Sequence, residues 1–265
     1  MFEKANVDES VDCDTYAIVY NHWPSPFTLN LTSIDEQIDE FKKIKKNSTE
    51  MLKFELKSEN DAHAKEVPVV DIFKFITEHY HGLVISGSDD SCVFDRRKPY
   101  LDKTLLPLIR SLLSIDFPMF GICFGAQAIV SAHYGDAVMS TMKKQNKLDE
   151  FGYTRLRTLK QDEILRDVPS EFVSGSYHSD CFVLKEGESI IGGDNWYSQA
   201  FHIPGKRAYG VQFHPEYDKE IVDECLEDVK VIYGIDTPVF LDANEPDMQV
   251  GRTMARNFIN LSLNK

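Results

Sequence analysis

The sequence predicts an α/β fold in which a doubly wound, mostly parallel sheet carries helices on both faces and a small antiparallel extension. Short apolar runs alternate with stretches of helical periodicity in the first half of the chain. Short β-like runs follow one another in the second half, which favours the antiparallel extension. We find no internal repeat and no linker rich in Gly, Pro or Ser. We therefore expect residues 1–265 to form a single domain.

The first half of the chain predicts strands and helices in alternation. Strands are expected at 15–20, 83–85 and 118–122, and helices are expected after Ser33, from Asp71 to Gly82, at 105–113 and around 126–132. Ser33 and Glu36 have the spacing of a capping box, and Asp71 is a candidate helix cap. Pro107 is expected in a first helical turn or at a kink. Residues 42–65 are charged and polar, so we expect an exposed insertion there.

The second half predicts the extension and two closing helices. β-like runs are expected at 153–159, 172–173, 181–184, 189–192, 199–202 and 207–213. Apolar residues at helical spacing predict one helix near 219–232 and another near 250–263.

The composition is that of a globular protein with an acidic balance. Of the 265 residues, 42% are hydrophobic and 27% are charged, and the formal net charge is −14 at pH 7. Such a chain repels phosphate backbones, so we expect no nucleic-acid partner. We also expect no membrane association, because neither an apolar secretory segment nor an apolar run of 18 residues is present. Five scattered cysteines without a Cys-x-x-Cys pair favour a reducing compartment, so we expect a cytoplasmic protein.

A Gly-x-Cys-x-Gly motif, residues 121–125, stands between a predicted strand and a predicted helix. Small flanking residues allow a sharp strand-to-helix turn that exposes the central Cys123. The helix N-terminus favours a thiolate there, and the N–H of Phe124 points to where an oxyanion would form. These features make Cys123 a candidate nucleophile. The alternative is a small hydrophobic residue at a tight turn.

A second motif, Gly210-Val-Gln-Phe-His214-Pro215-Glu216, ends an apolar strand. A nucleophilic cysteine needs a base, and the base needs a group that fixes its orientation. His214 and Glu216 supply both roles, with a stiff proline between them. In an open α/β sheet, His214 and Cys123 would meet at the carboxyl edge, where ligands bind. The alternative is an ordinary histidine at the end of a strand.

Together, the two motifs resemble those of the class I (triad-type) glutamine amidotransferases, especially stand-alone proteins similar to the amidotransferase half of guanylate synthetase. The resemblance covers about residues 15–217 and implies a flavodoxin-like sheet. It implies that Cys123 is the nucleophile, His214 the base and Glu216 its orienter. The implied reaction is hydrolysis of a γ-glutamyl amide through a glutamyl thioester, with no cofactor.

The resemblance also implies further site residues. Gln127 matches a position that helps to hold the substrate. Gly87 and Ser88 match the turn whose backbone N–H completes the oxyanion hole, although the second glycine and the proline of that turn are absent here. The segment Ser176-Tyr177-His178 resembles one that lines the glutamine site, and the glycine that usually follows it is replaced by Ser179.

Three functions stay open for a protein with a small-molecule substrate, glutamine or another γ-glutamyl compound. The first is an amidotransferase that releases ammonia for a separate synthetase subunit, because no P-loop pattern is present. The second is a γ-glutamyl peptidase or hydrolase without such a partner, and the third is a non-catalytic regulatory protein. A homo-oligomer is also open. We expect no metal, because His178 and Asp180 form no ligand spacing with His202 or His214.

Overall fold

The computed structural model describes most of the chain from residue 69 onward and three short strands before it. The described residues are 16–19, 28–31, 52–55, 69–88, 93, 101–141, 150–185, 187–193, 197–233 and 246–263. The helix predicted after Ser33 and most of the segment 42–65 lie outside these residues. The single domain predicted for the whole chain stays a prediction.

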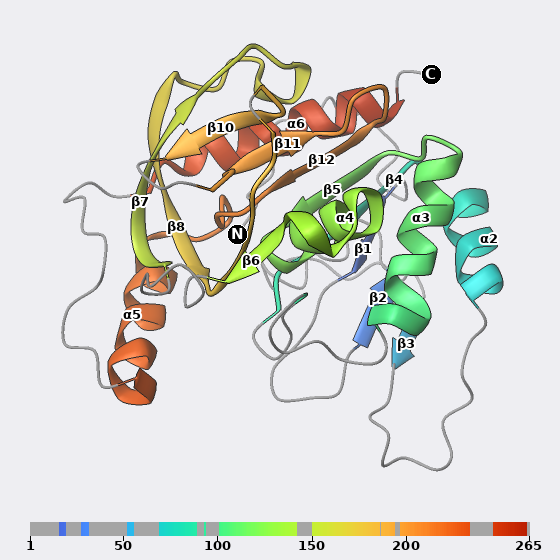
Figure 1. Ribbon diagram of the computed structural model, residues 1–265, viewed down its shortest axis with the longest axis horizontal. Helices are drawn as coiled ribbons and strands as arrows, with labels where there is room; N and C mark the ends of the chain where they lie inside the picture. Colours follow the sequence, from blue (N-terminus) through green and yellow to red (C-terminus); the bar gives the residue numbers. More distant parts are fainter. Residues whose placement is uncertain are drawn as a thin grey trace, which may run out of the picture.

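A mixed sheet forms the centre of the described structure (Figure 1). Its eight described strands run in the order β1 (Tyr16–Val19), β4 (Gly82–Ile85), β5 (Met119–Ile122), β12 (Ala208–Val211), β11 (Ala200–His202), β10 (Ser189–Gly193), β7 (Glu150–Thr158) and β8 (Glu171–His178). Strands β1, β4, β5 and β12 pair in parallel. From β12 to β8 every pairing is antiparallel. The α/β class is confirmed, and the antiparallel extension is larger than predicted because it makes half of this sheet.

Two antiparallel pairs accompany the main sheet in the described part of the chain. Strand β2 (Thr28–Leu31) pairs with β3 (Leu52–Glu55), and β6 (Met139–Thr141) pairs with β9 (Asp180–Phe182). Strand β3 lies inside the segment 42–65, whose charged composition predicts no strand. Cross-strand pairing with β2, which local composition does not reveal, accounts for it.

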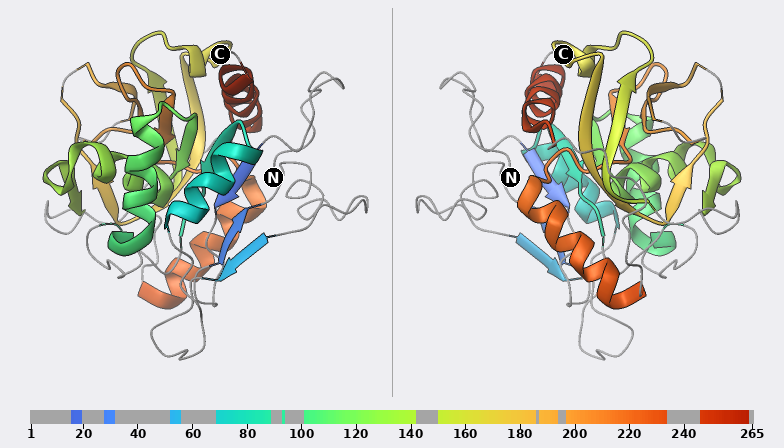
Figure 2. Two further views of the ribbon diagram at one scale, coloured as in Figure 1. Left: turned by 90° about the vertical axis from the view of Figure 1, so that its right-hand side faces the viewer. Right: turned by 90° about the vertical axis from the view of Figure 1, so that its left-hand side faces the viewer.

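Helices cover both faces of the sheet. They are α2 (Val69–His79), α3 (Leu106–Ser114), α4 (Phe124–Tyr134), α5 (Lys219–Tyr233) and α6 (Met248–Leu263), and one π-helical turn, Leu101–Leu105, leads into α3. Helix α4 lies in front of the strands in Figure 1 and α6 behind them. The side views show the two helices on opposite sides of the strands (Figure 2).

Pro107 lies in the first turn of α3, as predicted. The prediction that Asp71 caps a helix is wrong, since α2 already begins at Val69.

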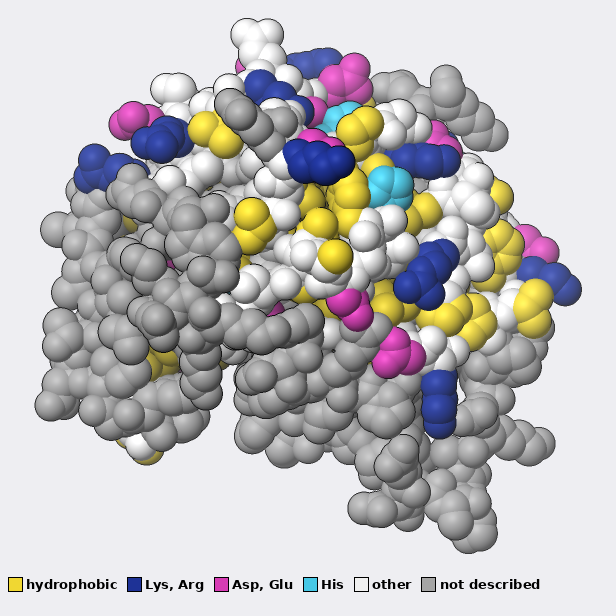
Figure 3. All heavy atoms as spheres, viewed as in Figure 1, with side chains coloured by type: hydrophobic (Ala, Val, Ile, Leu, Met, Phe, Trp, Pro, Cys, Tyr) yellow, Lys and Arg dark blue, Asp and Glu magenta, His cyan; other side chains and the backbone are white. Residues whose placement is uncertain are grey.

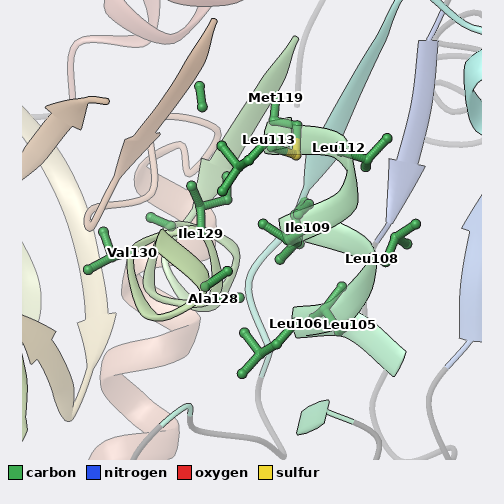
Figure 4. Close-up of a cluster of buried hydrophobic side chains, with 14 of the residues drawn as sticks. Leu105, Leu106, Leu108, Ile109, Leu112, Leu113, Met119, Ala128, Ile129 and Val130 are labelled. Carbon is green, nitrogen blue, oxygen red and sulfur yellow. The ribbon is translucent and has the colours of Figure 1, made fainter. Parts of the chain in front are cut away.

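Alternating residues of the parallel strands face two separate cores, because successive side chains of a strand point to opposite faces. Met119 of β5 is fully buried in a cluster with leucines and isoleucines of α3 and α4, which are drawn together in Figure 4. Phe120 and Ile122 face the other way and pack with Val250, Met254 and Phe258 of α6. A third cluster joins the buried face of α5 to β7 and β8. The parallel strands are therefore held between layers, which fixes the edge where they end.

A helix must be long and apolar to cross a membrane, and Figure 3 shows one face of the molecular surface. None of the described helices combines the length and apolar character needed to span a bilayer. On the described part of the face in Figure 3, basic and acidic side chains are interspersed.

Candidate active site

The backbone turns sharply at Cys123, between β5 and α4. Cys123 precedes the first residue of α4 with φ 50° and ψ −108°, a strained conformation for a residue other than glycine. Its N–H donates to the carbonyl of Val211 at 2.8 Å, which ties the turn to β12, and its carbonyl accepts from the N–H of Gln127 at 3.0 Å. The side chain is 5% exposed. Strain of this kind persists where the surroundings fix a side chain in place, and here they fix the sulfur at the sheet edge.

The two glycines of the motif allow this turn by close approach. A Cβ on Gly125 would lie 2.0 Å from the carbonyl oxygen of Ile85, the last residue of β4. A Cβ on Gly121 would lie 2.5 Å from the backbone nitrogen of Ala126. Both distances are far below van der Waals contact, so α4 can pack this close to the strands only with glycine at these positions.

His214 lies beyond the end of β12 and is held by β8. Its N–H donates to the carbonyl of Gly175 at 2.8 Å in an isolated antiparallel bridge. Its carbonyl accepts from the hydroxyl of Ser174 at 3.1 Å. The ring is nearly parallel to that of Tyr217, with 4.1 Å between centroids. Backbone and ring contacts together therefore fix the direction of the imidazole.

The imidazole of His214 is bonded to the carboxylate of Glu216 and lies near the side chain of Cys123. Its Nδ1 lies 2.7 Å from Oε1 of Glu216, and both the ring and the Cys123 side chain lie against Gly87. Burial alone lowers the pKa of His214, but the charges of Glu216 and of the Cys123 sulfur, together with the hydrogen bonds to both, raise its pKa to about 10. Near neutral pH the raised pKa therefore favours the protonated, cationic form of the His214 ring.

The turn after β4 lies over the imidazole and the cysteine. A Cβ on Gly87 would be 2.9 Å from Cε1 of His214 and 3.7 Å from Cβ of Cys123. Ser88 follows in the same turn, and Phe124, the residue after Cys123, begins α4. The structure thus brings Gly87 and Phe124 next to Cys123. Their oxyanion-hole role, and that of Ser88, stays a prediction.

Gly87→Ala should displace the imidazole of His214, because the added methyl group cannot lie 2.9 Å from Cε1. For the γ-glutamyl amide that the sequence predicts as substrate, we expect kcat to fall by about 10- to 100-fold, the cost of misplacing a catalytic group by a fraction of an ångström to about 1 Å. Steady-state release of ammonia or amine measures this. Gly192→Ala is the control, since a Cβ there meets only the Leu159 side chain, at 3.2 Å. Equal activity of the two variants would contradict the placement of the turn.

The other predicted substrate residues are engaged in hydrogen bonds within the protein. Gln127 is 2% exposed, and its Nε2 donates to the carbonyl of Asp180 at 2.9 Å. Ser176 is buried and accepts from the hydroxyl of Thr154 at 3.0 Å. The carbonyl of Tyr177 accepts a long hydrogen bond, 3.8 Å, from the Cys123 thiol. These contacts show where the residues lie, and their role in binding substrate stays a prediction.

His178, the last of the predicted lining residues, is held in a buried polar cluster. Its Nδ1 donates to the carbonyl of Asp180 at 3.0 Å, and its Nε2 lies 3.5 Å from Oε2 of Glu150. His202 is bonded elsewhere, with its Nδ1 2.8 Å from Oδ2 of Asp162. Within the described residues, no group of three or more His, Cys, Asp or Glu side chains is arranged to hold a metal ion.

Two residues that lie against the site, Gln212 and Gly251, were not predicted from the sequence. Gln212 is fully buried, and its Nε2 lies 3.8 Å from the sulfur of Cys123. Strand alternation could have identified it, because Gly210, Gln212 and His214 share one face. Gly251 of α6 lies against the turn after His214, where a Cβ would be 2.2 Å from the carbonyl oxygen of Pro215. No local pattern signals that contact, since it joins residues far apart in sequence.

Comparisons with known proteins give a matching family model and several relatives. The family model "Glutamine amidotransferase class-I" matches residues 36–228, well over half of the chain. A glutamine-hydrolyzing GMP synthase from Aquifex aeolicus is 33% identical over 172 residues, which are 64% of this chain and 30% of that protein. A protein from Methanosarcina barkeri that is named as one subunit of a glutamine-hydrolyzing GMP synthase is 32% identical over 151 residues, 56% of this chain and 69% of that one. The chain spans only 24–30% of the length of the full-length synthases that it matches.

A solved structure supports the fold over nearly the whole chain. The crystal structure of a glutamine amidotransferase from Thermotoga maritima superimposes with a TM-score of 0.62. The alignment covers 95% of this chain and 99% of that one, at 19% sequence identity. At that identity the likeness concerns the fold alone.

Proposed function

Because the chain belongs to the class I glutamine amidotransferase family, we propose that it hydrolyses the γ-amide of glutamine with Cys123, His214 and Glu216 as its catalytic residues. The observation that carries the proposal is the position of one buried imidazole, which is bonded to the Glu216 carboxylate and lies near the Cys123 side chain. A nucleophile, a base in hydrogen-bond reach and an orienting third group are what acyl transfer by a cysteine requires. The strained turn at Cys123 supports the same role, because strain of this kind gathers at active sites.

In the first half of the proposed reaction the thiolate of Cys123 attacks the carbonyl carbon of the γ-amide. The carbonyl oxygen becomes an oxyanion, and N–H groups near Phe124 and Gly87 are the proposed donors to it. The imidazolium of His214 gives its proton to the amide nitrogen, the carbon–nitrogen bond breaks and ammonia leaves. A glutamyl thioester remains on the sulfur.

In the second half, water hydrolyses the thioester. His214, now neutral, takes a proton from the attacking water, and the carbon–sulfur bond breaks to give glutamate and the thiolate. The ring is again an imidazolium, so the site is restored. Glu216 holds the ring by its bond to Nδ1 and stabilises the imidazolium in both halves. Every step uses side chains of this chain, so the proposal includes no cofactor.

The proposed destination of the ammonia is a separate synthetase. The relative from Methanosarcina barkeri is named as one subunit of a glutamine-hydrolyzing GMP synthase, and the present chain matches the full-length synthases over less than a third of their length. We propose by analogy that this chain supplies ammonia to an ATP-dependent partner. A γ-glutamyl peptidase that works alone would use the same three residues and differ only in the leaving group.

The function is tested by following glutamate and ammonia release from glutamine and from a panel of γ-glutamyl peptides. Each substrate is given to the purified protein alone and together with its co-purified synthetase. We expect glutamine turnover that rises when the synthetase is present. Turnover of peptides that exceeds turnover of glutamine would replace this proposal with the γ-glutamyl peptidase. If neither turnover nor labelling of Cys123 by a glutamine-mimicking chloroketone occurs in either setting, the proposal is wrong.

A further inference from the structure

Gln212 is a fully buried glutamine two residues before His214. Its backbone N–H donates to the carbonyl of Gln199 at 2.8 Å, so it continues the pairing of β12 with β11. It directly follows Val211, the last residue of β12, and its side chain is 0% exposed. Its Nε2 is 3.8 Å from the sulfur of Cys123. The amide therefore faces the proposed nucleophile from inside the protein.

The opposite end of the same amide is anchored. Its Oε1 accepts from Nε2 of Gln127 at 3.2 Å, and that Nε2 also donates to the carbonyl of Asp180 at 2.9 Å. A rotated Gln212 amide would set its N–H groups against those of Gln127 and would leave a buried donor without an acceptor. The network thus fixes which end of Gln212 faces the sulfur, and that end is the donor.

The groups around the Cys123 sulfur are of two kinds. Hydrogen-bond acceptors favour the protonated thiol, and hydrogen-bond donors favour the charged thiolate. The carbonyl of Tyr177 accepts from the thiol at 3.8 Å, so it favours the protonated form. A donor favours the charged form, because a hydrogen bond to an ion is stronger than one to its neutral form. Gln212 is such a donor, and the positive charge of a protonated His214 nearby acts in the same direction.

We propose that the Gln212 amide stabilises the thiolate of Cys123 and so increases the fraction of nucleophile that is ready to react. The proposal rests on the proposed function only in taking Cys123 as the nucleophile. Its consequence for the sulfur can be measured without turnover, because iodoacetamide alkylates the thiolate and not the thiol.

The experiment measures the rate of Cys123 alkylation against pH by mass spectrometry, in the wild-type protein and in Gln212→Met. Methionine has nearly the same length and lacks the donor. A hydrogen bond to a charged group is worth about one pH unit or more, so we expect the midpoint to move up by about one unit and alkylation below it to slow about tenfold. Gln212→Glu keeps the acceptor for Gln127 but turns a carboxylate oxygen to the sulfur, so its midpoint should rise further.

Gln199→Met is the matched control. Gln199 is also 0% exposed, and its Nε2 donates to the hydroxyl of Tyr197 at 3.1 Å rather than to the sulfur. This variant should lose thermal stability as the Gln212 variants do and keep the wild-type midpoint. An unchanged midpoint in Gln212→Met and Gln212→Glu, with folding verified by melting, would overturn the proposal. An equal shift in Gln199→Met would overturn it as well. Gln212→Glu alone decides the question if Gln212→Met does not fold.

Failure of this proposal is distinct from failure of the proposed function. Glutamine turnover that persists without Cys123 would sink the function, whatever the alkylation midpoints are. Turnover that depends on Cys123 together with an unmoved midpoint in the Gln212 variants would sink only the role of Gln212.

Discussion

Cys123→Ala is expected to lower the rate of glutamine hydrolysis by about 10⁴-fold or more. Removing a nucleophile abolishes the covalent route, and the binding and electrostatic stabilisation that remain support only a small fraction of the original rate. The measurement is steady-state release of glutamate and ammonia, with substrate binding followed separately by calorimetry. The fold should survive, because the side chain is small and its backbone bonds to Val211 and Gln127 do not need the sulfur.

Cys181→Ala is the matched control for that variant. Cys181 is fully buried, and its thiol donates to the carbonyl of Ser140 at 3.7 Å. Burial and the charges of Asp180 and Glu150 raise the pKa of the Cys181 thiol to about 12, so it stays protonated and unreactive. This variant should keep turnover within about twofold of wild type, since the residue plays no part in acyl transfer. Loss of activity in Cys181→Ala but not in Cys123→Ala would reverse the assignment.

Glu216→Gln is expected to lower kcat by about 10²- to 10⁴-fold with a smaller effect on KM. The neutral amide cannot hold the ring in the same way, and it no longer stabilises the imidazolium that donates to the leaving group. Glu224→Gln, an exposed position on α5, removes the same charge and should leave kcat unchanged. The result would be contradicted by equal kcat values for the two variants.

Both the stability of the protein and its kcat should depend on pH through the pair of His214 and Glu216. The pKa of His214 is raised from 6.5 to about 10, so its contribution to the free energy of unfolding is full below pH 6.5 and is lost as pH rises to about 10. Urea unfolding of the wild type should therefore show stability falling across that window, and kcat should fall as the imidazolium loses its proton near its upper end. Glu216→Gln removes a principal cause of the raised pKa, so both declines should move to lower pH.

Local patterns predicted the elements that carry the site. The flanking glycines of Cys123 predicted a strand, a sharp turn and a helix, and the structure has β5, the strained turn and α4 there. The strand that leads to His214 was also predicted from a local pattern, because an apolar run ends there in a polar turn. These features depend on neighbours in sequence, which is why single-sequence patterns reveal them.

Features that depend on partners far along the chain were not predicted. Strand β3 lies in a charged segment and owes its existence to β2, and the pair β6–β9 joins residues about 40 positions apart. The bonds of Gln212 to Cys123 and Gln127 likewise need the order of β5, β12 and β11, which no local pattern encodes. The expected cap at Asp71 was wrong because a good capping residue can also lie inside a first turn.

The most direct test of the central claim is to trap the acyl-enzyme on this sulfur. Wild-type protein is mixed with glutamine, quenched in acid within milliseconds and digested, and the peptide that contains Cys123 is weighed by mass spectrometry. A glutamyl thioester on Cys123 is expected, and it should be absent from Cys123→Ala and from the peptide that contains Cys181. A glutamyl adduct on another residue, or turnover of glutamine in Cys123→Ala at the wild-type rate, would contradict the account.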